Sequence, residues 1–189
     1  MAKLHYMYGT VSSGKTLQLL MIAHSYERQK KKVIIVKPEM DTRFGYGIIK
    51  TRVGLDRKAD VLIDDDPHIF DIPDYTSCIL VDEAQFLSKE WIDTFRNISL
   101  LYDIPVICFG LKTDFKSNLF SGSKRLLEIA DKIEEIKTIC NCCTRKATMN
   151  IKMVNGNPTT EGPSIELGAD EMYLPVCWDC YWAAIKKED

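Results

Sequence analysis

The sequence of 189 residues contains no apolar run that approaches the roughly 18 to 20 residues of a membrane span. Its first residues, MAKLHYMYG, hold an apolar stretch too short for a secretory signal, because a glycine-containing loop follows at once. The formal net charge is only −2, so no global positive field indicates a nucleic-acid partner. We therefore expect a cytoplasmic protein whose partners include neither a membrane nor a nucleic acid.

The seven cysteines are unevenly distributed along the chain. Cys78 and Cys108 each lie within an apolar run, whereas the other five follow residue 139. An odd number of cysteines without a secretory signal favours a reducing compartment, where clustered cysteines bind metal more often than they form disulfides. Apolar residues make up 46% of the chain, which is enough for a globular protein with a full core.

Apolar, β-branched runs alternate with segments of helical periodicity over the first 138 residues. Several of these runs are apolar on both faces, which is typical of a parallel sheet covered by helices on each side. The charged segment 39–60 has three glycines and no clear period, so we expect a long surface loop there. Ser88 is the expected N-cap of the second helix. Strands are expected at 3–8, 31–38, 59–63, 77–87, 104–111 and 134–140, and helices at 14–31, 88–101 and 121–133.

The segment MYGTVSSGKTLQLL, residues 7–20, contains the pattern Gly-x4-Gly-Lys-Thr between an expected strand and an expected helix. Glycines at this spacing permit a turn whose backbone N–H groups surround phosphate oxygens, and the N-terminus of the following helix adds partial positive charge. Lys15 would reach the β- and γ-phosphates, and the Thr16 hydroxyl would bind Mg²⁺. The alternative is a Gly/Ser-rich turn with a chance lysine. The expected phosphate-binding residues are Gly9, Thr10, Val11, Ser12, Ser13, Gly14, Lys15 and Thr16.

Asp82 and Glu83 come directly after the apolar residues of the fourth expected strand. In an open parallel sheet, the carboxyl end of that strand lies beside the phosphate loop. One carboxylate there suits Mg²⁺, and its neighbour, which points in a different direction, suits proton abstraction from an attacking hydroxyl. The alternative is a solvated strand end that carries two acids.

The remaining motifs narrow the phosphate chemistry. A GTP-specific switch protein needs an Asn/Thr-Lys-x-Asp guanine reader, and the nearest segment, LKTD at 111–114, begins with leucine. Motor ATPases and helicases usually need a longer chain than this one. A small kinase therefore fits the size and the motifs best.

Two Cys-x2-Cys pairs, Cys140 with Cys143 and Cys177 with Cys180, have the spacing of a four-cysteine zinc site. Four protein ligands leave no open position, so the zinc would be structural. The 33 residues between the pairs would form a long loop held by metal at both ends. Cys142 is surplus to this set, and a redox dithiol or a chance cluster is the alternative.

The composition also changes near residue 138. The residues beyond it lack helical period and are rich in Gly, Pro, Asn and Thr. We therefore predict a P-loop nucleotide-binding domain over residues 1–138 and a small four-cysteine domain over residues 139–189. The predicted fold class is α/β, with a P-loop NTPase-type parallel sheet flanked by helices.

Five segments together resemble the type II, zinc-containing thymidine kinase family in their order and approximate spacing. They are GTVSSGKT, KPEMDTRFG, VDEAQFL, FGLKTDFKSNLF and CNCC…YLPVCWDC, which span about residues 6–181. The resemblance implies transfer of the γ-phosphoryl group of ATP to the 5′-hydroxyl of thymidine or deoxyuridine in nucleotide salvage, with Mg²⁺ and a structural Zn²⁺. It also implies a C-terminal lasso that closes over the nucleoside, a homotetramer, and thymidine triphosphate as feedback inhibitor.

The same resemblance assigns roles to individual residues. Glu83 matches the general base, while Asp41 and Arg43 match a pair near the metal and the transferring phosphate. The expected magnesium residues are therefore Thr16, Asp41 and Asp82. The implied nucleoside-binding residues, whose aromatic members could equally be core residues, are Val11, Phe86, Leu111, Phe115, Asn150, Leu167, Gly168 and Tyr173.

Two positions depart from the family pattern. Val11 stands third in the phosphate loop, where the family usually has methionine. Asn150 stands seven residues past Cys143, the second cysteine of the first Cys-x2-Cys pair, where the family usually has threonine. Both positions border the nucleoside base in the family, so the preference between thymidine and deoxyuridine is left open.

The main alternative is a nucleic-acid-dependent P-loop ATPase whose four-cysteine module is a DNA-reading zinc ribbon. That function predicts a basic segment between the cysteine pairs, but residues 150–176 contain one lysine and four acids, which repel a phosphate backbone. A non-catalytic nucleotide sensor is a third hypothesis, and the presence of both Lys15 and Glu83 argues against it.

Overall fold

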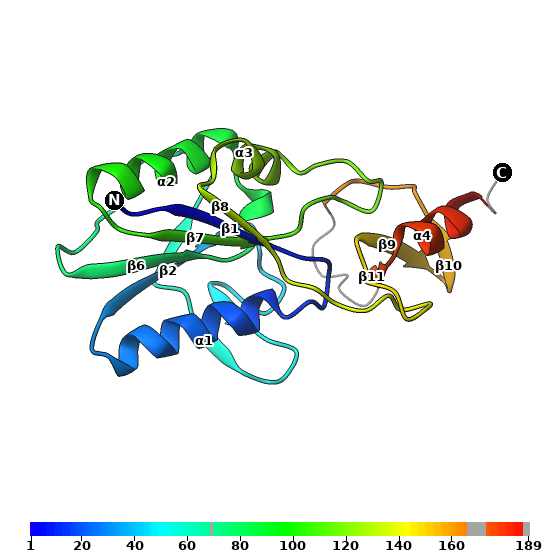
Figure 1. Cartoon of the computed structure of the whole chain (residues 1–189), viewed down its shortest axis with the longest axis horizontal. Coiled ribbons are helices and arrows are strands. Elements are labelled where there is room, and N and C mark those ends of the chain that lie inside the picture. Colours follow the sequence, from blue (N-terminus) through cyan, green and yellow to red (C-terminus); the bar gives the residue numbers. More distant parts are fainter. Residues whose placement is uncertain (69, 166–172, 187–189) are drawn as a thin grey trace.

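The computed structural model describes residues 1–68, 70–165 and 173–186. Within these residues, one parallel sheet contains β1 (Leu4–Tyr8), β2 (Lys32–Pro38), β5 (Val61–Ile63), β6 (Thr76–Val81), β7 (Val106–Gly110) and β8 (Lys132–Glu135). Their order across the sheet is β5-β2-β6-β7-β1-β8. The strands that lead into the two predicted motifs, β1 and β6, therefore lie on either side of β7 (Figure 1).

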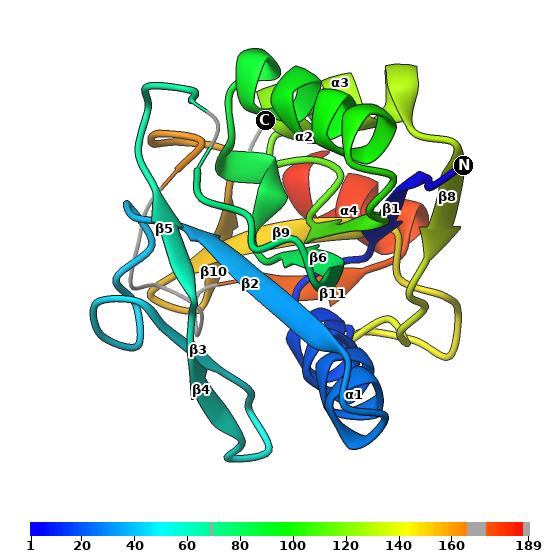
Figure 2. The same cartoon turned by 90° about the vertical axis from the view of Figure 1, so that its left-hand side faces the viewer.

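Helices cover both faces of this sheet. They are α1 (Lys15–Arg28), α2 (Lys89–Leu101) and α3 (Ser121–Ile129). Leu19 of α1 packs on one face, and Phe95 of α2 and Leu126 of α3 pack on the other. Figure 2 shows α1 below the sheet and α2 with α3 above it. Ser88 caps α2 as predicted, because its hydroxyl accepts the Trp91 N–H at 3.2 Å. The predicted α/β class is confirmed.

The segment 39–60 is more regular than the sequence predicted. It contains an antiparallel hairpin of β3 (Ile48–Lys50) and β4 (Asp56–Lys58). Ile49 is 1% exposed and packs in the same apolar cluster as Leu19 of α1, which fixes the hairpin on the α1 side of the sheet. The prediction of a long irregular loop is therefore wrong for residues 48–58.

The carboxyl-terminal residues build a second, smaller sheet. It consists of β9 (Met149–Val154), β10 (Asn157–Thr159) and β11 (Tyr173–Val176), and α4 (Trp178–Ile185) packs against it. Figure 1 shows this unit at one end of the main sheet. The segment between the cysteine pairs was predicted as one long loop, and its strands correct that prediction. The helix α4 was not predicted, and the division into two domains stays a prediction.

The end of α3 also differs from the prediction. The helix stops at Ile129 and β8 begins at Lys132, whereas the sequence suggested helix to residue 133 and strand from residue 134. Asp131 explains the early stop, because its N–H donates to the Leu4 carbonyl at 2.8 Å and its carboxylate accepts the Leu4 N–H at 2.9 Å. These bonds start the pairing of β8 with β1. Among the described residues, no helix is long and apolar enough to cross a membrane.

Candidate active site and metal centre

The phosphate loop connects β1 to α1, so the predicted strand–loop–helix context is confirmed. Gly9 leaves no room for a side chain, because an added Cβ would lie 2.4 Å from Ser13 Oγ and 2.6 Å from the Ile136 carbonyl oxygen. Gly14 has a φ of 85°, in the left-handed region that glycine adopts without strain. Both glycines of the motif are thus required by the backbone.

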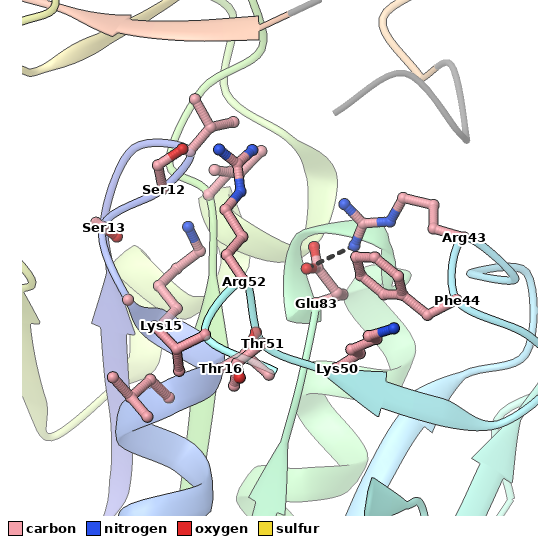
Figure 3. A pocket seen from close by; sticks show the side chains of 15 residues that line it. Ser12, Ser13, Lys15, Thr16, Arg43, Phe44, Lys50, Thr51, Arg52 and Glu83 are labelled. Atoms are coloured by element: carbon pink, nitrogen blue, oxygen red, sulfur yellow. Dashed lines mark ion pairs between the residues drawn. The ribbon is translucent and has the colours of Figure 1, made fainter. Parts of the chain in front are cut away.

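Lys15 lies within this loop and is 8% exposed. Its Nζ donates a hydrogen bond of 2.7 Å to the Thr10 carbonyl, so the loop folds around the ammonium group. The loop and the β3–β4 hairpin line a cavity of about 330 Å³. Figure 3 shows Lys15 between the loop residues Ser12 and Ser13 and the hairpin residue Arg52. The cavity therefore brings loop amides and cationic side chains together, as a polyphosphate site requires.

Thr16 and Asp82 meet at the carboxyl end of β6. Thr16 Oγ1 donates to Asp82 Oδ2 at 3.5 Å. Asp82 is 4% exposed, and its burial, reinforced by the neighbouring charge of Glu83, raises its pKa to about 7. A buried carboxylate beside a hydroxyl fits a divalent cation, because the cation would favour the ionised form that burial disfavours.

Glu83 has other partners than Asp82, which faces Thr16. Its φ of 52° turns the backbone left-handed directly after β6. Glu83 Oε1 lies 2.6 Å from Arg43 Nη2, and its Oε2 accepts a hydrogen bond of 2.5 Å from Gln85 Nε2. A left-handed conformation is strained for glutamate, and the contacts to Arg43 and Gln85 hold the carboxylate in place despite this strain.

Asp41 anchors the side chain of Arg43 through two contacts and also accepts the Arg43 backbone N–H at 3.4 Å. Arg43 Nε lies 2.7 Å from Asp41 Oδ1, and Arg43 Nη2 lies 3.1 Å from Asp41 Oδ2. Burial alone would raise the pKa of Asp41, but the hydrogen bonds and charges of Arg43 and Lys37 hold that pKa below its ordinary value. Of the three residues predicted for magnesium, Thr16 and Asp82 therefore face each other, whereas Asp41 faces Arg43 and Lys37.

A second cavity adjoins the first and gathers most of the residues predicted to bind a nucleoside. The rings of Phe115 and Tyr173 lie 5.9 Å apart in it. The helix α4 fixes this wall, because Tyr181 Oη donates to the Phe115 carbonyl at 2.7 Å. Leu167 and Gly168 lie outside the described residues. The predicted residues that line this cavity are Val11, Phe86, Leu111, Phe115, Asn150 and Tyr173.

The two cavities share Val11, Arg43, Glu83 and Leu111. In Figure 3, Arg43 and Glu83 face each other across the cavity from Lys15. A carboxylate at such a junction can accept a proton from a hydroxyl in one cavity while phosphates occupy the other. The cationic partner at the same junction can offset negative charge that develops between the two ligands.

Asn150 of β9 is 4% exposed, and its amide is engaged by the protein. Its Oδ1 accepts the Val11 N–H at 2.9 Å, and its Nδ2 donates to the Thr113 carbonyl at 3.3 Å. The residue thus connects the phosphate loop to the carboxyl-terminal sheet. Nothing in the sequence pattern indicated this bridging role.

Three further features of the site were not predicted. Gln85 Oε1 accepts the Leu111 N–H at 3.0 Å, so Gln85 joins Glu83 to the wall of the second cavity. Lys50 and Arg52 bring two cations from the hairpin to the first cavity. Of these residues, only Gln85 could have been recognised in the sequence, because it lies inside the motif VDEAQFL. Lys50 and Arg52 could not, because the hairpin segment has no clear hydrophobic period.

The four cysteines of the two Cys-x2-Cys pairs converge, with their sulfur atoms within 4.8 Å of one another. Cys143 Sγ lies 3.7 Å from Cys177 Sγ and 3.8 Å from Cys180 Sγ. Four thiolates at about 2.3 Å from a zinc ion would be about 3.8 Å apart in a tetrahedron, so this set fits such an ion. Burial alone would raise the pKa of Cys140, but backbone N–H groups, those of Cys177 and Cys142 foremost, lower it to about 6. Cys142 lies outside the set.

The parallel sheet, the phosphate loop and the paired carboxylates define a P-loop nucleotide-binding protein of the α/β class with a four-cysteine metal-binding unit. The family model for thymidine kinase matches residues 2–181. The chain belongs to the thymidine kinase family.

Individual relatives agree with this assignment. A thymidine kinase of Streptococcus agalactiae serotype Ia is 48% identical over 186 residues, which are 96% of this chain and 98% of the relative. A thymidine kinase of Streptococcus pyogenes serotype M3 is 47% identical over the same shares. A solved structure of Pif1 helicases unwinding forked DNA has a TM-score of 0.39 at 15% identity and covers 71% of this chain and 39% of that one. That likeness is too weak to bear on function.

Proposed function

We propose that the protein transfers the γ-phosphoryl group of ATP to the 5′-hydroxyl of thymidine, and of deoxyuridine, in nucleotide salvage. The observation that carries this proposal is the position of Glu83, which lies where the phosphate cavity meets the apolar cavity. A hydroxyl acceptor and a phosphoryl donor bound in the two cavities would meet at this carboxylate. Family membership supports the identity of both substrates.

On the phosphate side, the backbone N–H groups of residues 9–16 and the Lys15 ammonium would hold the triphosphate. Arg43 would offset the charge that develops on the transferred group. Thr16 and Asp82 would hold Mg²⁺, with Asp41 contributing from beside Arg43. When bound, the cation neutralises phosphate charge.

On the nucleoside side, the apolar walls would hold the base and the sugar. Phe86, Leu111, Phe115 and Tyr173 supply these walls in the proposal, and the backbone at Leu167 and Gly168 would hydrogen-bond the base edge. Glu83 would accept the proton of the 5′-hydroxyl as the phosphoryl group transfers in line. A lasso closed over the nucleoside would exclude water and so limit wasteful hydrolysis of ATP.

The four converging cysteines would hold one structural Zn²⁺. Four thiolates leave no open coordination position, so the ion would act on folding rather than on the reaction. Because Cys177 and Cys180 flank the start of α4, the ion would fix the helix that supports Phe115.

The family resemblance supports three further parts of the proposal: a homotetramer, a cytoplasmic location and feedback inhibition by thymidine triphosphate. The adjoining cavities are compatible with such an inhibitor, because its base and its phosphates could occupy both at once.

The test is incubation of the purified protein with γ-labelled ATP and each deoxynucleoside in turn. We expect labelled 5′-monophosphate from thymidine and deoxyuridine, and none from the purine deoxynucleosides. Rapid ATP hydrolysis on addition of DNA, with no labelled nucleotide from any pyrimidine deoxynucleoside, would contradict the proposal and support the nucleic-acid-dependent ATPase. Binding of ATP without hydrolysis or transfer would support a nucleotide sensor.

A further inference from the structure

Lys37, the penultimate residue of β2, is a buried cation beside the site. Its side chain is 1% exposed. An ammonium group removed from water must be paired and hydrogen-bonded to be tolerated. Lys37 Nζ meets this requirement with two partners that lie on separate segments: Asp41 Oδ2 at 3.1 Å and the Ile48 carbonyl oxygen at 2.7 Å.

The first partner leads to the junction of the cavities. Asp41 is 2% exposed and holds Arg43, which in turn contacts Glu83. Without Lys37, two largely buried carboxylates would share the single guanidinium of Arg43. With Lys37, these two carboxylates face two cations, and the buried carboxyl group of Asp82 interacts with the same four groups. Because Lys37 supplies a second cation, Asp41 and Glu83 need not compete for Arg43. The guanidinium can then contact both carboxylates at once, and these contacts together fix its orientation.

The second partner leads to the opposite wall of the phosphate cavity. Ile48 opens β3, and residues 50–53 of the same hairpin line the cavity. Figure 3 shows Lys50 and Arg52 rising from this hairpin, with Arg43 on a different segment. Ile49 also fixes the hairpin by packing in the core. The Lys37 bond to Ile48 adds a polar contact that ties the hairpin to the end of β2.

We propose that Lys37 is a positioning residue for the phosphate side of the site, because one ammonium group fixes both Arg43 and the β3–β4 hairpin. The inference rests on the proposed role of the first cavity as the ATP site. Lys37 does not line either cavity, so it acts through the segments that it holds. Its removal should affect ATP more than the nucleoside, because the hairpin lines only the first cavity whereas Arg43 lines both.

The test compares Lys37→Met and Lys37→Arg with the unaltered enzyme and with Arg125→Met. The Arg125 control loses two partly exposed ion pairs that line neither cavity: one to Asp93, 2.7 Å long, that joins α3 to α2, and one to Glu128, 3.0 Å long, within α3. For Lys37→Met we expect kcat/KM for ATP to fall roughly 10- to 100-fold, because small misplacements of catalytic groups have effects of that size. The KM for thymidine should rise less than the KM for ATP, and Lys37→Arg should recover most of the loss because it keeps the charge.

A purely structural role gives a different result. Partial unfolding lowers the amount of active enzyme, so it lowers kcat and leaves both KM values unchanged. A loss of kcat that disappears when the rate is normalised to the folded fraction, with both KM values unchanged, would overturn the proposal, and so would an equal rise in both KM values. If Lys37→Met does not fold, Lys37→Gln serves instead, since its amide can still donate to Ile48 and Asp41. The proposal then requires that the KM for ATP rise more than the KM for thymidine in this variant also.

Trypsin cleavage gives an independent readout of the hairpin. We expect faster cleavage of Lys37→Met within residues 43–58 than of Arg125→Met, and protection by ATP should be weaker. Equal cleavage rates would contradict the inference that Lys37 fixes the β3–β4 hairpin. An unaltered enzyme that forms no thymidine monophosphate would instead refute the proposed function, so the two failures are distinguishable.

Discussion

Arg43 and Glu83 form an ion pair, with 2.6 Å between Nη2 and Oε1, at the boundary between two cavities. Glu83 also accepts from Gln85, and Arg43 is also held by Asp41. Each member of the pair thus has a second partner that fixes its orientation. In-line phosphoryl transfer uses a proton acceptor and a cation near the transferred group, and most of its catalysis comes from positioning and charge stabilisation.

Glu83→Gln should keep the fold and lose the reaction. The amide retains the shape of the side chain but cannot accept the hydroxyl proton, so we expect kcat to fall about 10²- to 10⁴-fold. Glu134→Gln is the matched control, because Glu134 is a partly exposed carboxylate on β8 that pairs with Lys132 and His5 and lines neither cavity. Steady-state rates and thermal unfolding of both variants check the prediction. Near-full turnover of a folded Glu83→Gln protein would exclude the proposed base.

Asp82→Asn should stabilise the protein at alkaline pH when no magnesium or nucleotide is added. Folding raises the pKa of Asp82 from 3.8 to about 7, so the carboxyl group favours the folded state below pH 3.8 and loses that contribution as the pH rises through 7. Asparagine has no such dependence. From pH 5 to pH 8 the variant should gain on the order of 1–3 kcal/mol relative to the unaltered protein.

Thermal unfolding at both pH values measures the effect of Asp82→Asn. Asp103→Asn is the control, because that carboxylate is exposed and lines neither cavity. If the stability gained by Asp82→Asn relative to the unaltered protein stays constant or shrinks as the pH rises, burial does not disfavour the ionised form of Asp82. Phosphoryl transfer by Asp82→Asn should fall despite the added stability.

Cys177→Ser should remove the bound metal and weaken nucleoside binding. Serine is a poor replacement for a thiolate ligand, so we expect metal analysis to fall from one zinc per chain to near zero. Cys142→Ser is the matched control and should retain the metal, since Cys142 lies outside the converging set. The KM for thymidine should rise in the first variant only. Retention of a full equivalent of zinc by Cys177→Ser would contradict the four-cysteine site.

Asn150→Ala should weaken the binding of both substrates. The change removes the bonds of 2.9 and 3.3 Å to Val11 and Thr113, and lost buried hydrogen bonds cost about 1–3 kcal/mol. We expect KM to rise for ATP as well as for thymidine, because the residue joins the phosphate loop to β9. Asn97→Ala on the exposed face of α2 is the control. A rise for thymidine alone would show that Asn150 contacts the base without bridging.

The main sheet and the phosphate loop were predictable because their signals are contiguous. Gly9 and Gly14 belong to one short motif between an apolar run and a helical run, and no distant residue is needed to read it. Burial on both faces of β2 and β6 leaves long β-branched runs that indicate a parallel sheet directly. The convergence of the four cysteines followed from spacing alone.

Features that depend on tertiary contacts could not be predicted. The β3–β4 hairpin has little apolar pattern of its own and is held by Ile49 in the core and by the buried lysine below it. The helix α4 has only eight residues, which is too few for helical periodicity to be recognised in the sequence. The amide of Asn150 acts across 139 residues of sequence on Val11, which no local pattern reports.

The bond from Tyr181 to the Phe115 carbonyl has a consequence for the behaviour of the protein under oxidative stress. Tyr181 follows Cys180 directly, so the thiolates and the aromatic wall of the second cavity share one short helix. Peroxide that converts these thiol groups to disulfides would destroy the metal-binding set, and the helix would lose the support that a bound ion would give it. Oxidants would then weaken nucleoside binding. The phosphate loop, residues 9–16, contains no cysteine and would keep its shape.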